Sequence, residues 1–313
     1  MTHPILGLHH VTATVNDAQS DLDFCLELLG MRLVKKTVNF DNHHVYHFYY
    51  GTEQGAPGTI WTTFPYKDRG VGVGVRGAGQ VETTSFSVPA ASLGFWRERL
   101  KARGVAPEDV EPRFGEETLA MAGPSGLRLE LVGTNHDERA PWTGNGVGDH
   151  AAIRGLHGVT LVVRRLGPTL ALMTNVLGYT VVDQDASRTR VAAGSRTAGH
   201  FIDIIENPDA DAAVNGLGTV HHVAMAVSTS DEQLRLREEL LQMGIKVTEV
   251  RDRCYFQSIY FREPGGLFEA ATIRPGFTVD EASSALGRAL MLPHWEEQHR
   301  ADIEAGLAPV EYR

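Results

Sequence analysis

The chain has 313 residues, of which 42% are hydrophobic and 22% charged, a composition typical of a folded protein with a sizeable core. Its 29 Lys and Arg residues stand against 39 Asp and Glu residues, a formal net charge of −10. Because no long basic cluster offsets this charge, the sequence argues against binding to nucleic acid. The length exceeds that of most single-core proteins, so we expect two domains or one tightly paired double domain.

Cysteine usage and hydropathy indicate the compartment. Only Cys25 and Cys254 occur, each within an apolar or aromatic stretch, which fits a reducing environment. Residues 1–6 lack a charged region followed by an apolar secretory stretch, and no run of about 18 apolar residues occurs in the chain. We therefore expect a cytoplasmic protein that does not enter a membrane.

Four helical patterns follow one another at nearly equal intervals. In each, apolar residues recur at helical spacing and end at a glycine: Gly30, Gly104, Gly178 and Gly244. A glycine is the residue expected after a helix C-terminus, where a left-handed residue closes the last turn. The regular spacing indicates an internal repeat.

Each helical segment is preceded by one strand-like stretch and followed by three. In the first unit we expect strands at Gly7–Val15, Arg32–Val38, Val45–Tyr50 and Thr59–Phe64. In the last unit we expect them at Thr219–Val227, Lys246–Val250, Tyr255–Phe261 and Leu267–Thr272. Since one such unit cannot bury its sheet face alone, the predicted fold class is α+β, with four βαβββ modules paired into two curved-sheet domains.

The domain organisation follows from this repeat and from a stretch rich in Gly, Asn and charge that is typical of a linker. We predict an N-terminal domain at 1–135 with modules at 5–66 and 79–133, a linker at 136–150, a C-terminal domain at 151–276 with modules at 152–206 and 218–273, and a helical tail at 277–313. Within the tail, helical patterns cover Val279–Leu290 and Pro293–Ala305.

A similar strand start occurs three times, at Leu8–Thr12, Leu156–Thr160 and Val220–Ala224. The first and third copies contain a His-His pair, whereas the middle copy has Gly158 in place of the second histidine. A repeat that keeps a metal-ligand residue type in some copies and loses it in others suggests a duplicated scaffold with one surviving metal site.

Strand alternation selects one histidine from each pair. Neighbouring side chains on a strand point to opposite faces, and His9 and His221 share their faces with apolar rows that suit packing. His10 and His222 share theirs with small or hydroxyl-bearing residues. Alternation therefore predicts that His10 and His222 face the cavity and that His9 and His221 face away from it.

Glu269 is the expected third ligand, because it lies in an otherwise apolar strand of the fourth module. A buried carboxylate is costly unless it is paired or holds a cation. Ion pairing of Glu269 with Arg253 or Arg262 is the alternative. Glu130 is its counterpart in the second module, but the matching position in the third module is Gly158, so we interpret Glu130 as structural or vestigial.

Two histidines and one carboxylate leave about three positions of an octahedral ion open, the arrangement of non-haem Fe(II) enzymes that hold a substrate and O₂ together. Zn²⁺ with a bound water could use the same ligands, as could Mn²⁺. His43, His44 and His47 fall in the third strand of the first module; solvated or packing roles are favoured for them over lining the cavity.

Four segments together resemble the ring-cleaving dioxygenases of the vicinal oxygen chelate superfamily: Leu8–Thr12, Gly30–Asp41, Gly58–Ile60 and Tyr255–Ala270. The resemblance extends from about residue 6 to residue 276 and is strongest to the branch that contains hydroquinone and chlorohydroquinone 1,2-dioxygenases. It implies four βαβββ modules, an aromatic diol substrate and O₂ as the co-substrate. A homo-oligomer is compatible with it.

The same resemblance implies particular site residues. Fe(II), or in second place Mn(II) and then Zn(II), would be held by His10, His222 and Glu269. The family's positions around the metal and substrate map onto His9, Thr12, His221, Arg253 and Tyr260. In the reaction that the resemblance implies, Tyr260 would donate a hydrogen bond to a substrate or dioxygen oxygen, Arg253 would stabilise negative charge, and His221 would transfer a proton.

Two other functions compete with ring cleavage. A glyoxalase-type isomerase needs a fourth protein ligand, and Thr62 and Thr63 supply none at the expected place. A non-enzymatic module that binds or sequesters a small molecule usually lacks the three metal ligands, which this chain keeps.

Overall fold

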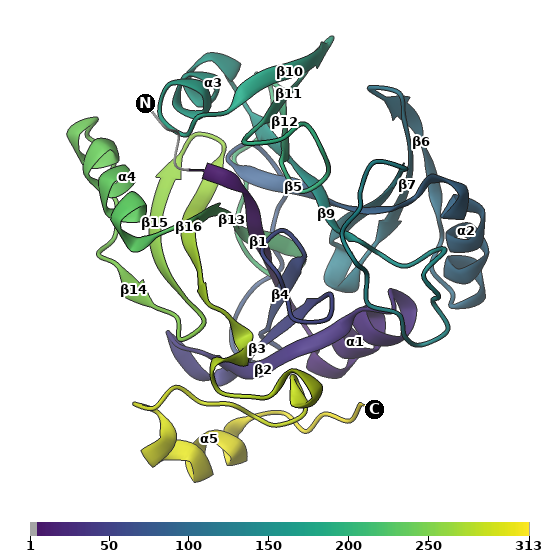
Figure 1. Cartoon of the computed structure of the whole chain (residues 1–313), viewed down its shortest axis with the longest axis vertical. Coiled ribbons are helices and arrows are strands. Elements are labelled where there is room, and N and C mark those ends of the chain that lie inside the picture. Colours follow the sequence, from purple (N-terminus) through teal and green to yellow (C-terminus); the bar gives the residue numbers. More distant parts are fainter. Residues whose placement is uncertain (1–4, 313) are drawn as a thin grey trace.

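The computed structural model describes residues 5–312, so residues 1–4, part of the segment considered for a targeting signal, lie outside it. Sixteen strands form two strongly bent eight-stranded sheets that pack side by side (Figure 1). The strand order is β14-β15-β16-β13-β1-β4-β3-β2 in the first sheet and β10-β11-β12-β9-β5-β8-β7-β6 in the second. These are the four βαβββ modules and two curved sheets predicted from the sequence.

The first sheet contains the first and the fourth module. The first module comprises β1 (Ile5–Val15), α1 (Ala18–Leu22), the π-helical turn η1 (Asp23–Leu28), β2 (Arg32–Asn39), β3 (Asn42–Gly51) and β4 (Ile60–Pro65). The fourth comprises β13 (Thr219–Val227), α4 (Ser230–Gln242), β14 (Arg251–Asp252), β15 (Phe256–Glu263) and β16 (Gly266–Pro275).

The second sheet contains the second and the third module. The second module comprises β5 (Gln80–Pro89), η2 (Ala90–Ser92), α2 (Leu93–Ala102), β6 (Glu108–Arg113), β7 (Glu116–Ala122), η3 (Pro124–Gly126) and β8 (Arg128–Thr134). The third comprises β9 (Gly155–Val163), α3 (Leu166–Asn175), β10 (Thr180–Asp185), β11 (Arg188–Ala192) and β12 (Phe201–Glu206).

Consecutive modules therefore do not share a sheet, contrary to the pairing expected for domains at 1–135 and 151–276. At the centre of each sheet the first strands of two modules run antiparallel, β1 beside β13 and β5 beside β9. In Figure 1 the purple β1 accordingly lies next to the green β13. All four first strands carry similar patterns, so the repeat alone does not specify which two pair.

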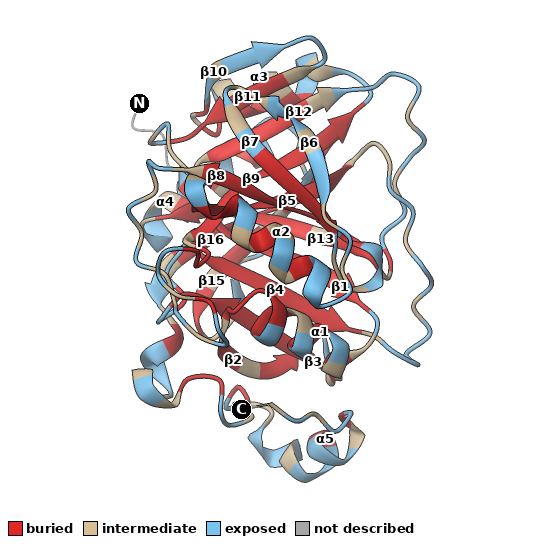
Figure 2. Cartoon of the chain, turned by 90° about the vertical axis from the view of Figure 1, so that its right-hand side faces the viewer, coloured by how far each residue is buried: buried red, intermediate tan, exposed pale blue. Residues whose placement is uncertain are grey.

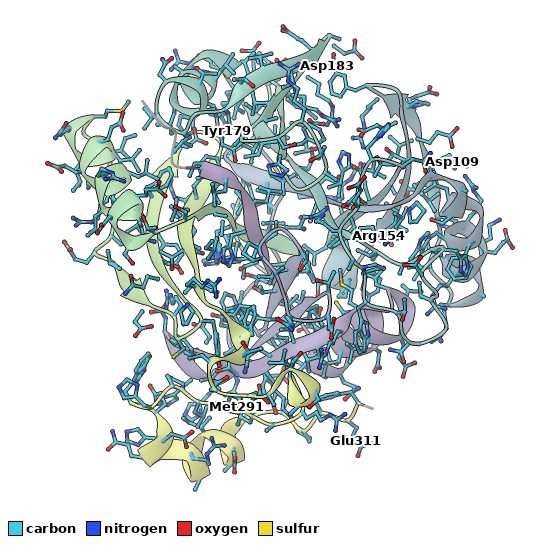
Figure 3. All side chains as sticks on the ribbon, in the orientation of Figure 1. Asp109, Arg154, Tyr179, Asp183, Met291 and Glu311 are labelled. Carbon is cyan, nitrogen blue, oxygen red and sulfur yellow. The ribbon has the colours of Figure 1, made fainter. Side chains whose placement is uncertain are left out.

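The tail is less helical than predicted. Its elements are three short turns, η4 (Phe277–Val279), η5 (Ser283–Ala285) and η6 (Glu297–His299), followed by α5 (Arg300–Gly306). Contacts with the edge strand β2 override the helical pattern: the buried Lys35 ammonium pairs with Asp280 and Glu281, and Met291 N–H donates to the Lys36 carbonyl. Figure 3 places Met291 on this tail, below the rest of the molecule.

The fourth module departs from prediction in its second strand. We expected a strand at Lys246–Val250, but β14 pairs only Arg251 and Asp252 with β15, and Val247 forms a single bridge to Phe261. This short edge strand carries Arg251, whose Nη1 lies 3.1 Å from Asp41 Oδ1.

The core runs through both sheets, whose central strands are almost entirely buried while the helices expose their outer faces (Figure 2). Trp61 of β4 meets Phe86 of β5 edge to face, with ring centroids 5.9 Å apart, so aromatic packing joins the two sheets. In the part of the chain that is described, no helix is both long and apolar enough to cross a membrane.

Candidate active site and metal centre

Three side chains from adjacent strands of the first sheet converge on one point. His10 Nε2 lies 3.2 Å from His222 Nε2, and Glu269 Oε2 lies 3.3 Å from the former and 2.8 Å from the latter. Their exposed fractions are 1%, 5% and 0%. The structure therefore brings together the three residues that the sequence analysis selected as metal ligands.

The donor set fits a divalent cation. Glu269 Oε2 is fully buried and has no partner in hydrogen-bonding geometry, although both imidazole Nε2 atoms are close. Burial alone would raise the pKa of Glu269, but its contacts with His10 and His222 bring that pKa well below its usual value. A buried carboxylate beside two imidazole nitrogens is a set of atoms that a divalent first-row metal prefers, and a cation would satisfy the orphaned oxygen.

Each proposed ligand histidine is backed by its sequence neighbour. His10 Nδ1 lies 2.9 Å from His9 Nδ1, and His222 Nδ1 lies 2.7 Å from His221 Nδ1. Because a metal-binding histidine uses its second ring nitrogen for an orienting hydrogen bond, these contacts leave both Nε2 atoms for the ion. Ser258 supports the third group, since its hydroxyl donates to Glu269 Oε1.

The prediction that His9 and His221 face away from the site is wrong, because each occupies a β-bulge. The register passes from Leu8 opposite Met225 to His10 opposite Ala224, which leaves His9 as the extra residue. On the partner strand, His221 is the extra residue. A bulge interrupts side-chain alternation and re-aims the inserted residue, so adjacent histidines lie next to the same site.

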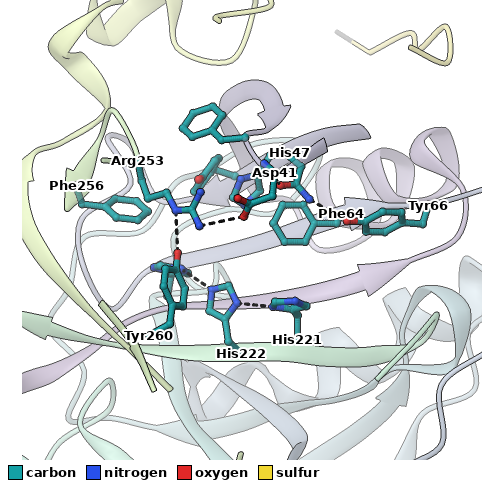
Figure 4. A pocket seen from close by; sticks show the side chains of 13 residues that line it. Asp41, His47, Phe64, Tyr66, His221, His222, Arg253, Phe256 and Tyr260 are labelled. Carbon is teal, nitrogen blue, oxygen red and sulfur yellow. Dashed lines mark hydrogen bonds and ion pairs between the residues drawn. The ribbon is translucent and has the colours of Figure 1, made fainter. Parts of the chain in front are cut away.

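A cavity of about 160 Å³ opens beside these ligands (Figure 4). His10, His222 and His221 contribute to its wall. Its aromatic lining residues are Phe40, Tyr49, Phe64, Tyr66, Phe256 and Tyr260. An apolar cavity of about 150 Å³ is large enough for a benzene ring, so the space fits a small aromatic molecule.

Arg253, Tyr260 and Asp41 form one edge of the cavity, with the Arg253 guanidinium between the other two in Figure 4. Arg253 Nε donates to the Tyr260 hydroxyl at 3.0 Å, and its Nη2 lies 3.2 Å from Asp41 Oδ2. Burial and the nearby Glu269 carboxylate raise the pKa of Tyr260, and Arg253 only partly offsets this. The phenol therefore stays protonated at neutral pH and can donate its own proton.

Sequence reasoning identified Arg253 and Tyr260 but missed Asp41. It also did not select His47, which lines the cavity although packing or solvated roles were favoured for it. His43 and His44, from the same strand, are about one-third exposed and lie outside the cavity. The available signal for His47 was its position two residues before Tyr49. Both side chains point to the same face of β3, and that face lines the cavity.

Thr12, the remaining predicted site residue, is on β1 of the first module, where its hydroxyl lies between His222 and Thr62 of β4. Its Oγ1 is 2.9 Å from His222 Nε2 and accepts a hydrogen bond from Thr62 Oγ1 at 2.8 Å. Both threonines are fully buried. Thr62 occupies the strand position at which the glyoxalase-type alternative would need a fourth ligand, and it offers a hydroxyl there.

The second sheet has a small cavity at the corresponding place, lined by different side chains. Glu130, the counterpart of Glu269, accepts hydrogen bonds from Ser85 at 2.8 Å and from Arg113 at 2.6 Å. Arg190 lies between Asp203 and the carboxylate of Glu116. The remaining cavity measures about 10 Å³, the room of roughly one water molecule. Guanidinium groups thus neutralise these carboxylates, in agreement with a structural reading of Glu130.

Comparisons with known proteins agree with this architecture. Residues 7–131 and 155–268 match the family described as the Glyoxalase/Bleomycin resistance protein/Dioxygenase superfamily. The chain is 41% identical to MhqO of Bacillus subtilis, a protein provisionally named a ring-cleaving dioxygenase, over 100% of this chain and 99% of that protein. It is 36% identical to the chlorohydroquinone/hydroquinone 1,2-dioxygenase of Sphingobium indicum, over 90% and 89% of the two chains.

A solved structure gives the same result. The crystal structure of a provisionally named dioxygenase from Bacillus subtilis superposes with a TM-score of 0.94 at 40% identity, covering 100% of this chain and 99% of that one. The two matched segments include the central strands of both sheets. The family match and these relatives show that the chain belongs to the Glyoxalase/Bleomycin resistance protein/Dioxygenase superfamily.

Proposed function

We propose that the protein is a metal-dependent dioxygenase that uses O₂ to cleave the ring of a dihydroxylated aromatic such as a hydroquinone. The observation that carries this proposal is the convergence of His10, His222 and Glu269 beside a cavity that His10 and His222 help to line, together with aromatic rings, and that has room for a single ring. Relatives named as ring-cleaving dioxygenases, one of them for hydroquinone, support it.

We assign Fe(II) to the site in preference to Mn(II), with Zn(II) third, and His10, His222 and Glu269 would hold it. Bound there, Fe(II) would supply the redox chemistry by which O₂ reacts with an aromatic diol, and would favour the ionised form of the diol. The two backing histidines, His9 and His221, would keep both ligand rings in the orientation that points Nε2 at the ion.

The protein's own groups would act on the substrate's oxygens. Tyr260 accepts a hydrogen bond from Arg253, so its proton is available for an oxygen in the cavity. Burial lowers the pKa of Arg253, but its surroundings, which include the Asp41 and Glu269 carboxylates, raise it above its ordinary value. Arg253 therefore remains cationic and would stabilise negative charge that develops there. Thr12 would donate to an oxygen beside His222.

His221 is the proposed proton-transfer residue. It lines the cavity and lies against His222, and burial followed by the charge of His222 lowers its pKa to about 3. It is therefore neutral at physiological pH. Because burial disfavours its charged form, it would take up a proton from the substrate hydroxyl only in passing and hand it on. Phe256, which packs against both His9 and His10, would hold the ring of the substrate against the ligand side.

The test combines metal loading with turnover. Protein loaded anaerobically with Fe(II) is mixed with O₂ and hydroquinone, catechol or a methylglyoxal–thiol adduct, and O₂ uptake and product absorbance are followed. The proposal predicts uptake with a diol and none with the adduct. Isomerisation of the adduct without O₂ uptake would instead support the glyoxalase-type function, and diol binding without turnover would support a non-enzymatic binding module.

A further inference from the structure

The first module contains a hydrogen-bonded chain that leads from the cavity wall to the ligand side of the site. His47 Nε2 lies 3.0 Å from Thr62 Oγ1, Thr62 Oγ1 donates to Thr12 Oγ1 at 2.8 Å, and Thr12 Oγ1 lies 2.9 Å from His222 Nε2. All four residues are at most 9% exposed. Two strands, β4 and β1, carry its middle members.

Module symmetry gives Thr62 a special position. In the fourth module Glu269 is opposite Ala224, the second residue after His222. In the first module Thr62 is opposite Thr12, the second residue after His10. Thr62 is therefore the first module's counterpart of Glu269, so it faces the same site from the other side of the sheet's central strand pair.

The direction in which these hydrogen bonds donate follows from the number of protons available. Thr62 has one hydroxyl proton and gives it to Thr12, so its contact with His47 requires His47 Nε2–H to be the donor. Thr12 accepts from Thr62, and its own proton is free to point towards His222. If the Nε2 lone pair of His222 is used for a metal, the acceptor that remains for this proton is an oxygen of a bound molecule.

His47 is well placed to remain a neutral, fixed donor. Its ring lies between Tyr49 and Phe64, with centroid distances of 4.0 and 4.3 Å. Burial, with the nearby charges of His10 and His222, brings its pKa well below the usual value. Successive hydrogen bonds of one direction polarise one another, so the chain strengthens the donor at its far end.

We propose that His47 is a positioning residue of this active site: through Thr62 it sets the direction in which the Thr12 hydroxyl donates, so that Thr12 presents its proton to the substrate oxygen beside His222. This inference rests on the proposed function for its substrate, an aromatic diol. The bond pattern itself belongs to the protein and can be tested without turnover.

The first measurement uses metal-free protein with ¹⁵N-labelled histidine. Long-range ¹H–¹⁵N correlations report which ring nitrogen carries the proton, and the His47 signals are identified by their loss in His47→Phe. The inference predicts that His47 is neutral with its proton on Nε2, and that Thr62→Val, which removes the acceptor, changes its nitrogen shifts. A proton on Nδ1 would overturn it, whether or not the protein turns over any diol.

The second measurement compares variants loaded with Fe(II). His47→Phe keeps an aromatic ring against Tyr49 and Phe64 and removes the donor, whereas Thr62→Val breaks the next link with almost no change of shape. Each should lower kcat for a diol about tenfold, less than the loss of about 10²–10³-fold for deletion of a direct oxyanion donor. KM and bound metal per chain should change less than twofold. His47→Gln, which keeps an N–H donor, should restore most of the rate.

Non-additivity distinguishes a chain from independent packing effects. The double variant His47→Phe with Thr62→Val should be no slower than Thr62→Val alone, because either change breaks the same connection. His44→Phe places the same ring on the same strand outside the cavity and should leave kcat unchanged. Losses that multiply, or a His47→Gln variant as slow as His47→Phe, would overturn the inference; absence of diol turnover in the wild type would defeat the proposed function instead.

Discussion

A buried carboxyl group between the two sheets makes the stability of this protein depend on pH in a way that can be calculated. Glu263, at the end of β15, accepts hydrogen bonds from Thr169 of α3 at 2.9 Å and from the Gly265 N–H at 2.6 Å. It is only 8% exposed. Burial raises its pKa from 4.5 to about 7, although both hydrogen bonds act in the opposite direction.

The number of protons bound in the folded and unfolded states decides whether the free energy of unfolding rises or falls with pH. Between the unfolded pKa of 4.5 and the folded pKa of about 7, the folded protein holds more protons at Glu263 than the unfolded chain. The free energy of unfolding therefore falls as pH rises through this window. The contribution of Glu263 is complete below pH 4.5 and lost above pH 7. At about 1.36 kcal/mol per pH unit of difference between the two pKa values, it amounts to roughly 3 kcal/mol.

Glu263→Gln isolates this effect, because glutamine keeps the shape and two polar atoms but does not titrate. Urea unfolding of metal-free wild type and variant, at intervals from pH 5 to pH 8, gives the difference between their free energies of unfolding at each pH. We expect the variant to gain roughly 2–3 kcal/mol relative to the wild type over this range. A difference that stays constant with pH would refute the assignment of a raised pKa to Glu263.

Further predictions concern the site, its vestigial counterpart and the sheet contact. Tyr260→Phe should lower kcat about 10²-fold with metal still bound, as measured by O₂ uptake and metal analysis; an unchanged rate would remove Tyr260 from the proposed chemistry. Arg113→Met should leave Glu130 buried without its cation and cost about 3–5 kcal/mol of stability in chemical denaturation, while Arg113→Met with Glu130→Leu should recover most of it; a stable single variant would contradict the ion-pair reading. Trp61→Ala should cost about 3–5 kcal/mol by the same assay, against less than 1 kcal/mol expected for the exposed Val73→Ala.

Much of the fold could be predicted from local patterns. Glycines that end helices, together with the alternating stretches around them, identified all four modules because both signals reflect nearby residues. The pairing of the first with the fourth module could not be predicted in this way. It depends on which of four similar central strands, β1, β5, β9 and β13, meet in space.

The candidate ligands were accessible to sequence reasoning because a buried acid in an apolar strand, Glu269, is conspicuous. The backing role of His9 and His221 was not, since alternation holds only for a regular strand and both residues occupy bulges. Two adjacent histidines in two copies of one motif were the available signal. Asp41 and His47 reach the site from a neighbouring hairpin. The parity of His47 with Tyr49 was a signal for the histidine, whereas the contribution of Asp41 depends on tertiary packing that no spacing encodes.

The structure of the tail could not be predicted from helical periodicity either. Its sequence has helical periodicity, yet within residues 277–312, the described part of the tail, only α5 is a helix of more than one short turn. The carboxylates of Asp280 and Glu281 satisfy the buried Lys35 ammonium, a charge that would otherwise be costly to bury. This long-range contact holds residues 280–281 against β2, and the short turns η4 and η5 stand where a longer helix was predicted.

The central claim is that His10, His222 and Glu269 hold one divalent ion. Anomalous X-ray scattering from crystals grown with Fe(II) under anaerobic conditions tests it most directly. We predict one strong peak per chain, about 2.0–2.3 Å from His10 Nε2, His222 Nε2 and a Glu269 carboxylate oxygen, and no peak there in His222→Ala. An ion bound elsewhere, or a peak of equal height in the variant, would contradict the account.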